Sequence, residues 1–150
     1  MRGFILSLEG PPCSYCFCNK LCGDAEIDHV VPQFYLKNKI SNRKFLFDAI
    51  NDPHNMYRVC HDQNSRKGKY LLSIKASEFE FAGLMARSYL YMNSTYHLQF
   101  DSYFLETLKY LSTFHPPFPY EVRRSRQISQ YTGHINTFIE YFPLTISTKN

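Results

Sequence analysis

The chain has 150 residues, the usual size of one domain, and 44% of them are apolar, which argues against a disordered polypeptide. Its 17 basic and 13 acidic residues give a formal charge of +4, which permits binding to a polyanion without demonstrating it. No stretch is apolar enough to span a membrane, and Met1–Leu8 is too short for the hydrophobic region of a secretory signal before Glu9 interrupts it. We therefore expect a single intracellular domain with no membrane partner.

Cysteines cluster near the start of the chain. Four of the five fall within ten residues and the fifth, Cys60, is distant; the clustered four are Cys13, Cys16, Cys18 and Cys22. An odd, clustered set is typical of metal binding rather than of a disulfide framework, and disulfides would not persist in a reducing compartment. We interpret residues 11–24 as a Cys-rich knuckle. It precedes residues 25–75, which carry the chemistry, and residues 76–150, which form a helical support within the same domain.

Two short strands are predicted in the central region. The first is Ala25–Val31, which is rich in β-forming residues and is ended by Pro32. Residues 33–50 are expected to form a loop that contains several turn-forming residues, with Phe45–Phe47 as an apolar anchor or a short helix. The second predicted strand is Asn55–Val59.

Four helices are predicted after the second strand. The first follows it directly, and the second and third carry apolar residues at helical spacing. Pro119 suits the first turn of the fourth helix and Gly133 suits the position just after its end. The expected bounds are His61–Ile74, Glu78–Met92, Asp101–Phe114, and Pro119 to just before Gly133.

Three polar groups stand where these elements meet. Asp28 and His29 lie at the end of the first strand, and Asn64 shares one face of the following helix with Lys67. Hydrolysis of a phosphodiester needs a base that takes a proton from water and a cation that neutralises the developing charge. Imidazole suits the first role because its pKa lies near neutrality, and carboxylate and amide oxygens suit Mg²⁺. Adjacent strand residues point to opposite faces, so Asp28 and His29 can share one site only if the strand ends or twists there.

The order of these residues resembles the HNH endonucleases, through Cys13-x-x-Cys16, Asp28-His29-x-x-Pro32, Asn55 and Cys60-x-x-x-Asn64-x-x-Lys67-Gly68. A longer resemblance, over residues 25 to 140, is to the endonuclease I family within the wider ββα-metal (His-Me finger) group. It rests on segments 28–33, 52–56, 83–92, 114–117, 121–124 and 136–139. The chain departs from that family in having Asp28 where most members have Glu, Thr137 where they have Pro, and the Cys knuckle of the HNH proteins.

The resemblance implies an α+β fold in which a ββα-metal (HNH-like) finger packs on a mostly helical scaffold. It implies a nonspecific or weakly specific nuclease that leaves 5′-phosphate ends. His29 would be the general base, and Asp28 and Asn64 would bind one Mg²⁺ (or Mn²⁺). DNA is the expected substrate, with RNA as the alternative.

A structural zinc ion is also expected from the resemblance. Zinc-bearing HNH proteins have a second cysteine pair, which here would be Cys60 and position 63, but position 63 is Gln, a poor zinc ligand. We expect Cys13, Cys16 and Cys60 to bind zinc, with Cys22 or Cys18 as the fourth ligand and His61 as a further alternative. Reduced buried thiols are the competing interpretation.

Basic side chains are candidates for phosphate contacts, which would make binding salt-dependent and largely independent of sequence. These candidates are Lys67, Arg66, Arg87, Arg123 and Arg124, with Lys69 and Arg126 beside them. Arg87 lies within an apolar helix, so a structural ion pair is its alternative role. His54 and Asn55 are expected to fix the loop that carries the site through hydrogen bonds, without acting in catalysis.

The predicted function is therefore a metal-dependent endonuclease. The main rival is a zinc-stabilised nucleic-acid-binding module without catalysis, and a third interpretation is a structural zinc-knuckle interaction protein. The sequence leaves the oligomeric state open.

Overall fold

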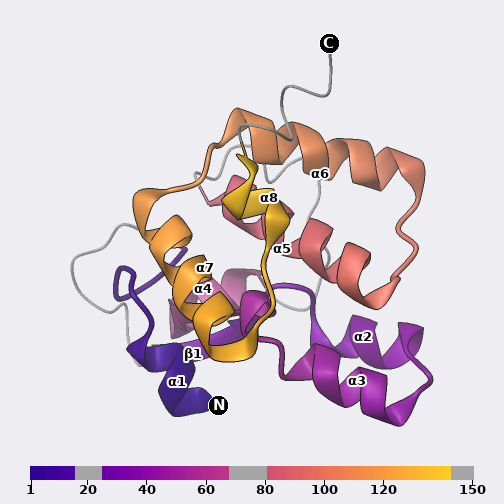
Figure 1. Ribbon diagram of the computed structural model, residues 1–150, viewed down its shortest axis with the longest axis horizontal. Coiled ribbons are helices and arrows are strands. Elements are labelled where there is room, and N and C mark those ends of the chain that lie inside the picture. Colours follow the sequence, from indigo (N-terminus) through magenta and orange to yellow (C-terminus); the bar gives the residue numbers. More distant parts are fainter. Residues whose placement is uncertain (16–24, 68–80, 143–150) are drawn as a thin grey trace.

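The computed structural model describes residues 1–15, 25–67 and 81–142. Helices and one small sheet place the chain in the α+β class (Figure 1). The sheet has two antiparallel strands, β1 (Ala25–His29) and β2 (Met56–Cys60). The helices and the single 3₁₀ turn of the described residues are α1 (Arg2–Ser7), α2 (Gln33–Lys39), α3 (Arg43–Ile50), η1 (Pro53–Asn55), α4 (His61–Lys67), α5 (Ala82–Tyr96), α6 (Ser102–Phe114), α7 (Pro119–Thr132) and α8 (Thr137–Glu140). None of these helices is both long and apolar enough to cross a membrane.

Helix α5 forms the centre of the core. Of its 15 residues, 12 are buried, and it packs beside α6 while also contacting η1, α3 and α8 (Figure 1). The close approach to the end of α6 depends on Gly83, because a Cβ atom there would lie 2.1 Å from the carbonyl oxygen of His115. The helix runs past the predicted end at Met92 and stops where His97 takes a left-handed conformation, with φ at 53°.

The predicted third and fourth helices are confirmed as α6 and α7. The Asp101 side chain caps α6 by accepting a hydrogen bond from the Phe104 N–H at 2.8 Å. Pro119 begins α7, and Gly133 follows it with φ at 77°. Local sequence signals were sufficient here because the caps and breakers lie next to the helices that they end.

The prediction of a loop over residues 33–50 is wrong for most of the segment, whereas the short helix allowed at Phe45–Phe47 is confirmed within α3. This segment forms α2 and α3, which lie side by side (Figure 1). Asn42, which resembles a loop residue in the sequence, caps α3 by accepting a hydrogen bond from the Phe45 N–H at 2.9 Å. Each helix buries an apolar side chain in the core, Leu36 from α2 and Ala49 from α3. Helices this short depend on such packing rather than on propensity.

The strands and the flanking helices also differ in their bounds. β1 ends at His29 rather than Val31, and β2 is shifted one residue later because Asn55 belongs to η1. α4 begins at His61 as predicted, and the rest of that predicted helix, 68–74, lies outside the described residues. The predicted start of the next helix, 78–80, also lies outside them. Helices α1 and α8 were not predicted.

Candidate functional site

The end of β1, the start of α2 and the second half of α4 surround an open pocket. β2 leads directly into α4, and α4 packs against both strands. The pocket has a volume of about 400 Å³. It is lined by Ile27, Asp28, His29, Pro32, Gln33, Phe34, Asn64, Ser65 and Lys67. The structure therefore brings together Asp28, His29, Asn64 and Lys67, the four central residues of the predicted site.

Asn55 holds the chain in place just after β1. Its Oδ1 accepts a hydrogen bond from the Val31 N–H at 2.7 Å, and its Nδ2 donates to the Val31 carbonyl at 3.0 Å. The Asn55 carbonyl also accepts a hydrogen bond from the Val30 N–H at 2.9 Å. These bonds take the chain out of the strand ladder after His29. Asp28 and His29 can then line one pocket although they are neighbours in a strand.

His29 is held in one tautomer. Its Nε2 lies 2.8 Å from the carbonyl oxygen of Ile50, which can only accept, so Nε2 carries the proton. Nδ1 therefore holds the lone pair, and the Gln33 side-chain amide donates to it at 3.2 Å. Burial lowers the pKa of His29, and the charges of Lys67 and Lys37 act in the same direction. The imidazole is thus neutral near pH 7, which is the state that a general base requires.

Asp28 is buried, and both of its carboxylate oxygens accept hydrogen bonds. Oδ2 accepts a hydrogen bond from the Tyr15 hydroxyl at 2.5 Å and lies 2.8 Å from the Lys67 ammonium, which also donates to Oδ1 at 3.1 Å. Burial raises the pKa of Asp28, and the Lys67 charge opposes that rise. The same ammonium donates to the His29 carbonyl at 3.0 Å.

Glu26 orients Asn64. The Asn64 Nδ2 donates to Glu26 Oε2 at 2.6 Å, and His61 Nδ1 lies 2.6 Å from Oε1 of the same carboxylate. These hydrogen bonds, that of Asn64 first, lower the pKa of Glu26. Because the amide nitrogen is anchored on Glu26, the amide oxygen of Asn64 points away from that carboxylate.

Sequence reasoning missed four residues around the pocket: Tyr15, Glu26, Gln33 and Lys37. A signal existed for three of them. Glu26 lies two residues before Asp28 and so shares its strand face, and Gln33 and Lys37 are one helical turn apart. The second signal was hidden because α2 was predicted to be a loop. No local signal places Tyr15 against Asp28, since the contact is between separate elements.

Two of the predicted zinc ligands lie together. Cys13 and Cys60 are both buried, and the Cys13 Sγ accepts a hydrogen bond from the Cys60 N–H at 3.3 Å. Burial raises the pKa of the Cys13 thiol. The other candidates, Cys16, Cys18 and Cys22, lie outside the described residues. Within the described ranges, no three His, Cys, Asp or Glu side chains gather as a metal-binding group.

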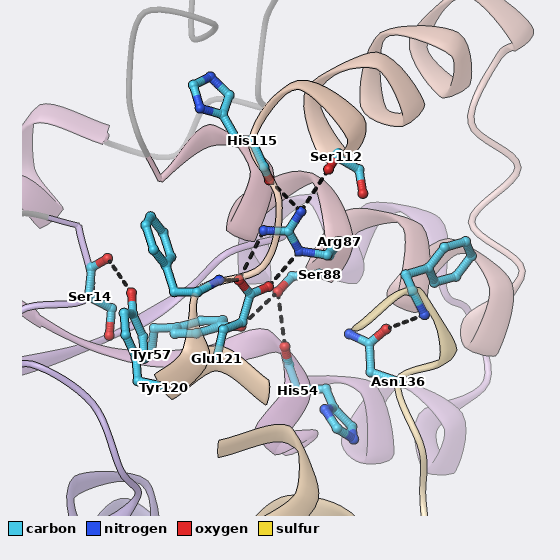
Figure 2. A network of polar contacts seen from close by, with 12 residues as sticks. Ser14, His54, Tyr57, Arg87, Ser88, Ser112, His115, Tyr120, Glu121 and Asn136 are labelled. Atoms are coloured by element: carbon cyan, nitrogen blue, oxygen red, sulfur yellow. Dashed lines mark hydrogen bonds and ion pairs between the residues drawn. The ribbon is translucent and has the colours of Figure 1, made fainter. Parts of the chain in front are cut away.

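The prediction of Arg87 as a phosphate contact is wrong. Figure 2 shows its guanidinium between the Glu121 carboxylate and the carbonyls of Ser112 and His115. The distances to Glu121 are 2.6 Å from Nε and 2.9 Å from Nη2. The side chain is fully buried, so no phosphate can reach it. The structural ion pair left open as its alternative role is the observed one.

Arg124 is also wrongly predicted as a phosphate contact. It is 3% exposed, donates to the carbonyls of Pro53 and Met56, and stacks 3.8 Å from the centre of the Tyr57 ring. These contacts join α7, which carries Arg124, to η1 and β2. Arg66 and Arg123 are exposed, and Arg123 pairs with Glu9.

His54 lies outside the pocket and joins η1 to the end of α7. It is 1% exposed, and its Nε2 donates to the His134 carbonyl at 2.9 Å. Its Nδ1 is buried with no hydrogen-bond partner among the described residues. A second proton would place a charge there without compensation, and burial accordingly lowers the pKa of His54 from 6.5 to about 4.

We expect the protein to lose stability as the pH falls from 6.5 to 4. Between pH 6.5 and pH 4, His54 takes up a proton in the unfolded chain but not in the folded one. Its contribution to the free energy of unfolding is therefore complete above pH 6.5 and is lost as the pH falls toward the pKa of the folded state. The difference between a pKa of 6.5 and one of about 4 corresponds to about 3 kcal/mol at most.

Urea denaturation at pH 7 and pH 4.5 measures this loss in the wild type and in His54→Gln. The glutamine amide can still donate to the His134 carbonyl but does not titrate. The variant should therefore lose less stability over the window. An equal loss in both proteins would assign the acid sensitivity to other groups.

No protein-family model matches this chain, and no curated protein matches it.

Proposed function

We propose that the protein is a metal-dependent endonuclease that hydrolyses phosphodiester bonds of DNA, with RNA as the alternative substrate. One observation carries the proposal. A neutral histidine, fixed by its Nε2 bond to the Ile50 carbonyl, lies in the same open pocket as Asp28, Asn64 and Lys67. A base, oxygen donors and a cationic side chain are the parts that phosphodiester hydrolysis requires.

The order of strand, strand and helix supports a ββα-metal site. His29 ends β1, Asn55 fastens the turn that follows, and Asn64 lies on the helix that continues β2. In this proposal each of the three has one role. His29 is the base, Asn55 is a positioning residue, and Asn64 is a metal ligand.

The oxygen atoms of the pocket fit a hard cation. Two Asp28 oxygens and the His29 carbonyl already surround the positively charged nitrogen of Lys67 at 2.8 to 3.1 Å. Asp28 and the oxygen of Asn64 would hold Mg²⁺ or Mn²⁺, both of which prefer such donors. When bound, the metal would stabilise the charge that develops on the phosphate and the leaving oxygen.

The protein's own groups would act as follows. His29 Nδ1 accepts the proton of the attacking water, and Gln33, which now donates to Nδ1, gives way to that water. Lys37 is exposed on α2 close enough to lower the pKa of His29, and Arg66 is exposed on α4. Both can contact the phosphates that flank the reacting one, which would give salt-dependent binding.

We also propose a structural zinc ion at the start of the chain. The adjacent buried thiols of Cys13 and Cys60 support it, because two sulfur ligands from distant segments already meet. The remaining ligands would come from Cys16, Cys18 and Cys22. A closed site of this kind would stabilise the fold without acting in catalysis.

Conversion of supercoiled plasmid tests the proposed activity. We expect nicked and then linear DNA with Mg²⁺ or Mn²⁺ and none with EDTA, because the cation is needed at the phosphate. A single-stranded RNA of matched length, run in parallel, decides between the two substrate classes. If no divalent metal supports cleavage of either substrate, the protein is not a nuclease, and a binding module without catalysis takes its place.

A further inference from the structure

We infer that Lys67 is a built-in competitor for the metal: its ammonium occupies the cation position of the pocket, and a divalent metal binds by displacing it. The inference rests on the proposed metal site. It adds a step in which the protein exchanges its own cation for the metal.

The ammonium has the surroundings of a bound cation. Three oxygen atoms lie within 3.1 Å of Lys67 Nζ, two from the Asp28 carboxylate and one from the His29 carbonyl. The ion pair is nearly closed to water, with side-chain exposures of 10% for Lys67 and 8% for Asp28. Asp28 would otherwise be a buried carboxylate without a counter-charge, so Lys67 completes the site when no metal is bound.

A metal ion and the Lys67 ammonium cannot bind the Asp28 carboxylate at the same time. The carboxylate has about four lone-pair directions, and Lys67 and Tyr15 already use three of them. A divalent cation at the remaining direction would lie close to the ammonium in a site with little water to screen their repulsion. Metal binding therefore requires Lys67 to leave, while Tyr15 keeps the carboxylate in place.

After displacement, the Lys67 side chain would be free to contact the substrate. Lys67 is on α4 and reaches the pocket with a flexible four-carbon stem. Once released from Asp28, its ammonium can contact the phosphate of a bound nucleic acid. The exchange would thus couple metal binding to substrate binding, and the two should favour each other.

Titration of the zinc-loaded 150-residue chain with Mn²⁺ tests the exchange without relying on activity. Free Mn²⁺ is measured by electron paramagnetic resonance for the wild type, Lys67→Met and Arg66→Met. Methionine keeps the length of the stem, and Arg66→Met makes the same charge change at the neighbouring exposed residue. We expect Lys67→Met to bind Mn²⁺ about tenfold more tightly than Arg66→Met, and Asp28→Asn to lose this binding.

A second measurement on the wild type covers the case in which Lys67→Met fails to fold. Acylation of lysines, followed by mass spectrometry, should become faster at Lys67 when Mg²⁺ is added and stay unchanged at Lys109, which is already 47% exposed. If Lys67 stays protected at saturating Mg²⁺, or if Lys67→Met binds Mn²⁺ no better than Arg66→Met, the exchange does not occur.

These outcomes are distinct from failure of the proposed activity. Plasmid cleavage with Mg²⁺ but no gain in Mn²⁺ affinity would remove the exchange and keep the nuclease. Tighter Mn²⁺ binding without cleavage would keep the exchange and remove the nuclease. Cleavage by the wild type in EDTA that is lost in Lys67→Met would make Lys67 the working cation and overturn the exchange.

Discussion

Substitution of His29 by alanine should slow Mg²⁺-dependent cleavage by about 10²- to 10⁴-fold, the usual contribution of a general base. The fold and the affinity for nucleic acid should change little. The His29 side chain is held by two hydrogen bonds of its ring, to the Ile50 carbonyl and the Gln33 amide. The backbone carbonyl that accepts from Lys67 is kept in the alanine variant. Single-turnover cleavage rates measure the chemical step, and fluorescence anisotropy with a labelled duplex measures binding.

His134→Ala is a matched control for this substitution. Its side chain is exposed, and it interacts with His54 through its backbone carbonyl, which the substitution retains. We expect its cleavage rate to equal that of the wild type. Added imidazole should restore part of the activity of His29→Ala and leave the control unchanged. Full activity in His29→Ala would show that another group takes the proton.

The four central residues of the pocket could be predicted from sequence because they lie in short segments of the chain. Asp28 and His29 end β1. Asn64 and Lys67 lie one helical turn apart on α4, the helix that directly follows β2. For these residues to meet in one pocket, β1 has only to pair with β2 in antiparallel fashion and the strand has only to end after His29. The end of the strand was visible only as Pro32, whereas the bonds from Asn55 that enforce it join residues 24 positions apart.

The errors have a common physical origin, which is that burial depends on contacts between distant segments. Residues 33–50 look polar and contain turn-forming residues, yet Leu36 and Ala49 anchor two helices on the core. Arg87 is a charged residue in an apolar helix, and its partner Glu121 is 34 residues later. A sequence pattern can show that such a charge is unusual, but it cannot show whether a phosphate or a carboxylate neutralises it.

Substitution of Arg87 by methionine should destabilise the protein by about 3–5 kcal/mol, the usual cost of removing one partner of a buried ion pair. Glu121 would remain fully buried with an uncompensated charge, and the carbonyls of Ser112 and His115 would lose a donor (Figure 2). These carbonyls lie where the end of α6 meets α5, so the effect should reach the whole core. Urea denaturation at pH 7 measures the free energy of unfolding.

The exposed pair of Arg126 and Glu140 provides the control. Their atoms are 3.3 Å apart, and the Arg126 side chain is 61% exposed, so Arg126→Met should cost between about 0 and 1 kcal/mol. Glu121→Gln combined with Arg87→Met should recover part of the loss, because it removes the buried charge and keeps an oxygen that can accept from the Phe118 N–H. This recovery would separate the cost of an unpaired charge from the cost of lost packing. If Arg87→Met instead kept its stability and weakened binding to DNA with a smaller salt dependence, the guanidinium would be a phosphate contact after all, and its enclosure by Glu121 would have to open when DNA binds.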